Sequence, residues 1–203
     1  PFRYDCIFFD SCHMGCIEVA YELRSKCDYV VVSPTEIMAQ GFPYYMMMEQ
    51  LFNNSDFEAA ITAVAKEYYD YYMKDSSGDG TVTVVRCAGL QPIAEFCSDM
   101  FDRYRDRISI LNPGALQVYD RCRCHWLFDL GDLVQRLSSS AEYREFESLL
   151  NNVIVYKAAT PEFLTIPIRK YSGLGMYLPN PEYVVLNRYY KTLLWNKDTD
   201  LVR

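Results

Sequence analysis

Two short apolar runs near the start of the chain predict neighbouring strands of a parallel sheet. The first run ends at Asp10, and the second covers residues 28–33. Apolar residues recur at helical spacing over residues 15–24, which predicts a connecting helix. Both runs are apolar throughout, as in strands that are buried on both faces. A strand, a helix and a strand in this order predict a right-handed crossover, so both strands should end at the same edge of the sheet.

Helical and strand patterns alternate along the rest of the chain. The apolar spacing predicts further helices over residues 55–73, 90–108, 128–138 and 141–151. β-branched residues predict strands over 81–86 and 153–156, whereas residues 183–195 fit either a strand or a helix. The three methionines at 46–48 are expected to pack on a helix. This order of elements predicts a three-layer α/β/α sandwich around a mostly parallel sheet.

Length, charge and hydropathy narrow the class of protein. The chain has 203 residues, of which 50% are hydrophobic, so one domain over residues 1–203 can bury a sizeable core. The net charge of −7 and the scattered Lys and Arg residues argue against a nucleic-acid partner. The longest apolar runs, such as residues 29–32, are too short to cross a bilayer, and no signal peptide pattern is visible.

Two segments invite a metal site but match no ligand pattern. In Cys122-Arg123-Cys124-His125 the two cysteines are too close together for a structural zinc site, which also needs a second ligand pair. The acidic loop at 75–80 offers carboxylates to calcium without the alternating ligands of a calcium-binding loop. We therefore predict no metal site and no required cofactor, with calcium as the one alternative.

Cys12 is the candidate nucleophile among the eight cysteines. It comes two residues after the first predicted strand, and functional residues of open α/β sheets gather at such strand ends. The pattern also places it at the start of the predicted helix, where the helix dipole would favour an ionised thiol. The alternative is a buried, inert thiol, as we expect for Cys6 and Cys97 on their apolar faces.

Segments around Cys12 form a distinctive pattern. They are FFDSCHMG (residues 8–15), IEVAYEL (17–23), DYVVVSPTE (28–36) and GFPY (41–44), with weaker matches at 172–179 and 189–195. Together they resemble the clostripain family of caspase-like cysteine peptidases.

This resemblance implies an activity and a partner. Cys12 would attack the scissile carbonyl and form an acyl-enzyme, with a histidine as its acid/base partner. In the family that histidine lies some tens of residues before the cysteine, and only eleven residues precede Cys12 here. We therefore expect the chain to be the cysteine-bearing, C-terminal portion of a caspase-like domain. The histidine would reside on a light chain from the same precursor, released by internal cleavage, in a bacterial protein that is secreted or located in the periplasm or cell envelope.

The resemblance also assigns residues to substrate binding. Asp10 would form the floor of the primary specificity pocket and pair with an Arg or Lys side chain before the scissile bond. An alternative role for Asp10 is to cap the following helix. Ser33, Glu36 and Gln40 belong to the loop that would wall the pocket. Family members that prefer basic residues commonly carry a further acid near the position of Gln40, so this glutamine departs from the pattern.

Neither histidine of the chain fits the role of the base. His13 directly follows Cys12, and adjacent residues at a helix start point in different directions. His125 lies far along the chain in a segment expected to be structural. Two functions follow: a cysteine endopeptidase that cleaves after Arg or Lys with a histidine from a partner chain, or an inactive clostripain-like domain that binds or scaffolds.

Overall fold

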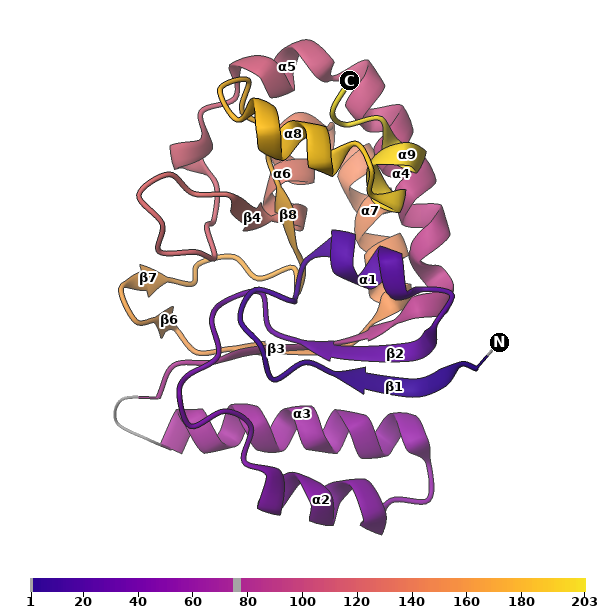
Figure 1. The fold of residues 1–203 in the computed structure, drawn as a ribbon, viewed down its shortest axis with the longest axis vertical. Coiled ribbons are helices and arrows are strands. Elements are labelled where there is room, and N and C mark those ends of the chain that lie inside the picture. Colours follow the sequence, from indigo (N-terminus) through magenta and orange to yellow (C-terminus); the bar gives the residue numbers. More distant parts are fainter. Residues whose placement is uncertain (1, 75–77) are drawn as a thin grey trace.

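A four-stranded mixed sheet lies at the centre of the molecule, which is a computed structural model that describes residues 2–74 and 78–203 (Figure 1). Its strands are β1 (Tyr4–Phe8), β2 (Cys27–Val32), β3 (Thr81–Arg86) and β5 (Ile154–Ala159), in that spatial order. β1 and β2 are parallel neighbours, as predicted. β3 runs antiparallel to both of its neighbours, so β1, β2 and β5 point the same way.

Two helices cover one face of this sheet. They are α2 (Tyr44–Asn53) and α3 (Phe57–Lys74), drawn below the sheet in Figure 1. Ile61, Val64 and Tyr68 of α3 are buried against the strands, as their helical spacing predicted. The ring of Tyr68 packs 4.4 Å from that of Phe42, measured between ring centroids, which ties the segment before α2 to this core.

The opposite face carries the larger hydrophobic core and the other seven α-helices of the described residues. These are α1 (Ile17–Leu23), α4 (Leu90–Arg103), α5 (Arg105–Ile110), α6 (Leu130–Leu137), α7 (Ser140–Val153), α8 (Val184–Tyr190) and α9 (Leu194–Thr199). Trp195 of α9 is fully buried and packs edge-on against Tyr21 of α1. With helices on both faces of the sheet, the predicted three-layer α/β/α architecture is confirmed (Figure 1).

Short strands and turns complete the structure. β4 (Leu127–Asp129) pairs antiparallel with β8 (Gly175–Tyr177), and β6 (Glu162–Phe163) pairs with β7 (Ile166–Pro167). Two 3-10 turns, η1 (Cys87–Gly89) and η2 (Pro113–Ala115), precede α4 and β4.

Several boundaries differ from the sequence prediction. The helix predicted over 90–108 is two helices, because the chain leaves helical geometry at Tyr104. The ambiguous segment 183–195 is helical and forms α8 and the start of α9. Of the three methionines on α2, only Met47 is buried. The acidic loop predicted at 75–80 lies partly outside the described residues.

All eight cysteines are free thiols. Cys97 is buried and Cys6 is half-buried, as their apolar faces predicted, whereas Cys12, Cys122 and Cys124 are exposed. None of the helices in the described ranges has the length and apolar character that crossing a membrane requires.

Candidate active site

Two loops meet at the carboxyl ends of β1 and β2, as the crossover predicted. We call them the Cys12 loop (residues 9–16) and the β2 loop (residues 33–43). The Gly15 N–H donates a hydrogen bond of 2.7 Å to the Ser33 carbonyl. A Cβ added at Gly15 would lie 2.3 Å from the nitrogen of Pro34, so only glycine lets the two backbones approach this closely.

The Cys12 thiol is exposed in a turn of the Cys12 loop. The prediction that it lies at a helix N-terminus is wrong, because α1 begins only at Ile17 and the chain first turns through a left-handed His13, with a φ of 62°. The β2 loop supplies the nearest donor instead. The N–H of Ile37 lies 3.3 Å from the Cys12 sulfur, and the Ile37 carbonyl oxygen lies 3.9 Å from it. These contacts fix the position of the sulfur at the junction of the two loops.

The Asp10 carboxylate is exposed and bonded to a residue that the sequence did not single out. The Tyr44 hydroxyl donates a hydrogen bond of 2.6 Å to Asp10 Oδ2. This bond is the main reason why the pKa of Tyr44 is raised to about 12, with a smaller contribution from burial. The alternative that Asp10 caps α1 is wrong, because the N-cap residue is Cys16 and no side chain caps that end. Tyr44 is the last residue of the GFPY segment (residues 41–44). The family resemblance of this segment was the only feature of the sequence that pointed to Tyr44.

Ser33 anchors the β2 loop to strand β3. Its side chain is fully buried, and its hydroxyl lies 2.8 Å from that of Thr81 on β3 and 3.2 Å from that of Thr35. A buried cluster of hydroxyl groups satisfies its own hydrogen bonds and anchors the loop to the sheet. In this structure, therefore, the Ser33 side chain holds the loop in place and does not face the solvent beside Cys12.

Glu36 and Gln40 lie on the solvent side of the same loop. Both Nε and Nη2 of Arg121 donate to Glu36 Oε2, at 3.0 and 2.6 Å. This ion pair joins the β2 loop to a segment 85 residues away in sequence, and nothing in the local pattern around Arg121 indicated it. Gln40 is exposed in the turn before Gly41. Arg121 neutralises Glu36, whereas Asp10 forms no salt bridge with a Lys or Arg of the described residues.

Asp120 organises the loop that carries Arg121. Its carboxylate accepts hydrogen bonds from the backbone N–H groups of Cys122, Trp126 and Leu127, at 3.0, 2.8 and 2.9 Å. Burial raises the pKa of Asp120, but these donors and the His125 ring outweigh burial and lower it overall. The candidate zinc segment thus serves as a tightly bonded turn. Within residues 2–74 and 78–203 there is no group of three or more His, Cys, Asp or Glu side chains that could hold a metal ion.

Both histidine rings bond to backbone oxygens. His13 Nδ1 lies 3.1 Å from the Pro34 carbonyl, and His125 Nδ1 lies 2.9 Å from the Asp120 carbonyl. In the part of the chain that the structure describes, the hydrogen-bond partners of the Cys12 sulfur are the two backbone groups of Ile37. Within residues 2–74 and 78–203, therefore, no histidine ring is hydrogen-bonded to the thiol.

The comparison with protein families identifies the family to which this chain belongs. The model of the clostripain family, Peptidase_C11, matches residues 2–201. The chain belongs to the clostripain family. A comparison with curated proteins returned no match.

Solved structures of clostripain relatives cover almost the whole chain. An inactive zymogen C11 protease from Parabacteroides distasonis is 34% identical, with a TM-score of 0.88 over 98% of this chain and 59% of that one. A clostripain from Bacteroides thetaiotaomicron, in complex with the peptide inhibitor BTN-VLTK-AOMK, is 27% identical, with a TM-score of 0.84 over 98% of this chain and 88% of that one. A secreted C11 cysteine protease from B. thetaiotaomicron, "iotapain", is also 27% identical, with a TM-score of 0.84 over 98% of this chain and 56% of that one. The chain thus spans about three fifths of the zymogen's length.

The ion pair between Arg121 and Glu36 gives a first testable prediction for this clostripain-family chain. It holds the β2 loop one residue from Ile37, whose N–H contacts the Cys12 sulfur. We expect Arg121→Ala to lower kcat by about three- to tenfold, because a sulfur displaced by a fraction of an ångström attacks less well. Stability should change by less than about 1 kcal/mol, since the pair is partly exposed. Hydrolysis kinetics and thermal unfolding of the unmodified protein and the variant measure the two effects.

A matched control distinguishes the effect of this particular ion pair from the general effect of removing a positive charge. Arg203 is likewise an arginine in ion pairs, here with Asp102 and Asp200. It is the last residue of the chain, at the end marked C in Figure 1. Arg203→Ala should leave kcat unchanged. Equal kinetics for Arg121→Ala and the unmodified enzyme would contradict a positioning role for this pair.

Proposed function

We propose that this chain is the nucleophile-bearing part of a cysteine endopeptidase that cleaves after basic residues. The observation that carries the proposal is the exposed Cys12 thiol, held by the Ile37 N–H at 3.3 Å where the parallel strands β1 and β2 end. Asp10, two residues earlier in the same loop, adds an exposed carboxylate. Membership of the clostripain family and the protease relatives support the same chemistry.

The proposed reaction passes through an acyl-enzyme. A histidine base takes the proton of the Cys12 thiol, and the sulfur attacks the carbonyl carbon of the scissile peptide bond. The C–N bond then breaks, and the leaving amine takes the proton from the histidine. Water, deprotonated by the same histidine, attacks the thioester and releases the new carboxyl group, and the proton returns to the sulfur.

The histidine in this proposal comes from a partner light chain. Both rings of this chain are engaged with backbone oxygens, and neither bonds to the Cys12 sulfur. The outer edge of β1 offers a place for the partner, because β1 is the terminal strand of the sheet within the described residues. Its backbone groups on that side can pair with an added strand, and Phe2 before the strand and Tyr4 at its start are exposed.

The negative charge of Asp10 supports the proposal that the substrates carry Arg or Lys before the scissile bond. A cationic side chain that enters next to Cys12 would meet the carboxylate of Asp10, which no Lys or Arg of the described residues neutralises. The peptide inhibitor bound to the B. thetaiotaomicron clostripain, BTN-VLTK-AOMK, contains the peptide sequence VLTK, which ends in lysine. By analogy with the relative described as secreted, we also propose that this protein acts outside the cytoplasm of a bacterium.

Reconstitution tests the proposed function. The 203-residue chain should hydrolyse Arg and Lys peptides only after the light chain that carries the histidine is added. Replacing the histidine of that light chain by alanine is the matched control and should remove the activity again. Full activity of the isolated chain would contradict an external base. Inactivity of the complete complex towards all peptides would favour the alternative, a clostripain-like domain that binds or scaffolds without catalysis.

A further inference from the structure

The two carboxylate oxygens of Asp10 have different surroundings. Oδ2 accepts the hydrogen bond of 2.6 Å from the Tyr44 hydroxyl. Gly41, with a φ of +66°, packs so closely that an added Cβ would lie 2.7 Å from Oδ2 and 3.1 Å from Oδ1. Among the residues that the structure describes, none donates a hydrogen bond to Oδ1. Oδ2 therefore already accepts a hydrogen bond from the protein, and Oδ1 is the oxygen that has no donor among the described residues.

We propose that Tyr44 determines specificity by leaving Asp10 one free oxygen, which favours lysine over arginine as the residue before the scissile bond. This inference rests on the proposed peptidase function. A guanidinium group binds carboxylates best as a fork, with one N–H on each oxygen. An ammonium group is a compact charge that needs a single acceptor and fills its remaining donors with water or backbone. Because the Tyr44 hydroxyl already bonds to Oδ2, the second N–H of an arginine fork must compete with it for that oxygen, whereas lysine needs only Oδ1.

The start of α2 and a contact with Phe42 position the side chain of Tyr44, which is 53% exposed. It is the first residue of α2, and its ring lies 6.5 Å from that of Phe42 between centroids. Phe42 is buried, and the carbonyl of the adjacent Gly41 accepts a hydrogen bond of 2.7 Å from the Tyr72 hydroxyl of α3. Arginine would have to displace a hydroxyl whose ring rests on this core in order to reach Oδ2. The raised pKa of Tyr44, about 12, keeps its proton on the phenol as a donor to Asp10 at physiological pH.

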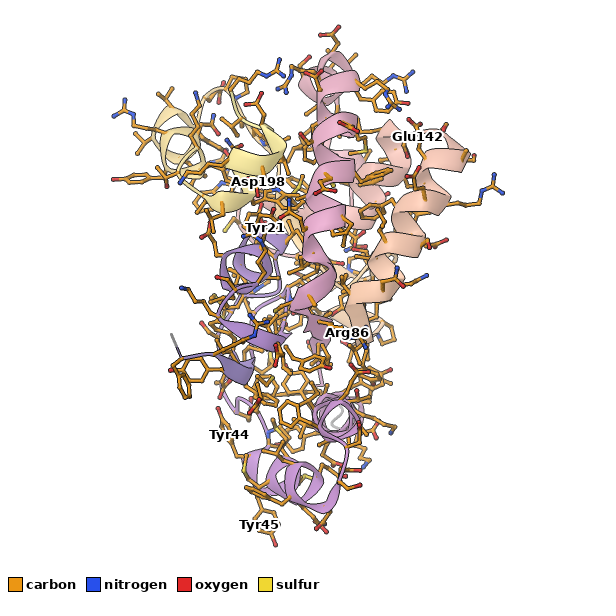
Figure 2. All side chains as sticks on the ribbon, turned by 90° about the vertical axis from the view of Figure 1, so that its right-hand side faces the viewer. Tyr21, Tyr44, Tyr45, Arg86, Glu142 and Asp198 are labelled. Carbon is orange, nitrogen blue, oxygen red and sulfur yellow. The ribbon has the colours of Figure 1, made fainter. Side chains whose placement is uncertain are left out.

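The test compares two neighbouring tyrosines of α2. Tyr44 bonds to Asp10, whereas Tyr45 is 91% exposed and points away from the sheet at the outer end of the molecule (Figure 2). In the reconstituted two-chain enzyme, kcat/KM is measured for two peptides that differ only in Lys or Arg before the scissile bond. Tyr44→Phe should lower the Lys/Arg ratio of kcat/KM by about tenfold, because the phenylalanine frees Oδ2 for a second guanidinium N–H. Tyr45→Phe should leave the ratio unchanged.

Two results would overturn the inference without touching the proposed function. They are an unchanged Lys/Arg ratio in Tyr44→Phe, and a ratio that moves further towards lysine, each with hydrolysis intact. A binding measurement separates the two claims if turnover is absent. The same pair of peptides is titrated into the complex that carries Cys12→Ala, with and without Tyr44→Phe, and their dissociation constants are compared. A Lys/Arg affinity ratio that falls in Tyr44→Phe supports the inference, whereas equal ratios or no binding of either peptide contradict it.

Discussion

Cys12→Ala is expected to abolish peptide hydrolysis and to leave the fold intact. Removal of a covalent nucleophile costs on the order of 10⁴-fold or more in kcat, because what remains of the site can only bind and polarise the substrate. The thiol is exposed, and its hydrogen-bond contacts are with the backbone of a single residue, Ile37. Its loss should therefore shift the free energy of unfolding by less than about 1 kcal/mol. Kinetics of the two-chain enzyme and thermal unfolding of each variant measure both effects.

Cys124 provides the matched control for this substitution. It is also an exposed free thiol, but it lies in the loop organised by Asp120. Cys124→Ala should keep full activity, and alkylation of that variant should still inactivate it through Cys12. Turnover by Cys12→Ala at the rate of the unmodified enzyme would end the assignment of Cys12 as nucleophile.

Asp10→Asn should impair hydrolysis after Arg or Lys far more than hydrolysis after uncharged residues. The amide keeps the shape of the side chain and an oxygen for the Tyr44 hydroxyl, but it removes the negative charge that attracts the substrate cation. Leaving that cation without its charged partner should cost on the order of 2–4 kcal/mol, which is about thirty- to a thousandfold in kcat/KM. Both a higher KM and a lower kcat are expected, since the contact also positions the carbonyl over the sulfur. Matched peptides with Lys, Arg or norleucine before the scissile bond provide the measurement.

Glu36→Gln is the control for charge near the site. Glu36 pairs with Arg121, so its replacement should lower the rates for basic and neutral peptides by the same small factor. Losses in Asp10→Asn that are equal for basic and neutral peptides would reduce Asp10 to a structural role. If Glu36→Gln lowered hydrolysis after basic residues more selectively than Asp10→Asn does, then Glu36 and not Asp10 would determine the specificity.

The sequence alone predicted correctly that β1 and β2 are parallel neighbours whose following loops meet at one edge of the sheet. Continuous apolar runs before Asp10 and over β2 predicted a parallel pair, and the chain order predicted that their ends would meet. The helical spacing along α3 likewise predicted which of its residues are buried. These features depend on local periodicity and chain connectivity, which the order of residues expresses directly.

The contacts of the candidate site depended on the tertiary structure. Periodicity could not show that four residues lie between Cys12 and the first residue of α1, because turn geometry leaves little trace in an apolar pattern. It could not show that the Ile37 N–H replaces a helix end beside the sulfur, or that the Tyr44 hydroxyl caps one oxygen of Asp10.

The sequence by itself thus determined the βαβ unit, the family pattern and the identity of the candidate nucleophile and acid. Only the tertiary structure decided that Ser33 is buried among hydroxyl groups and that Arg121 neutralises Glu36 from 85 residues away. The physical reason is that burial and ion pairing arise where distant segments pack together. A local pattern shows which side chains are available for such contacts, and the packing of loops and helices on the sheet selects which of them meet.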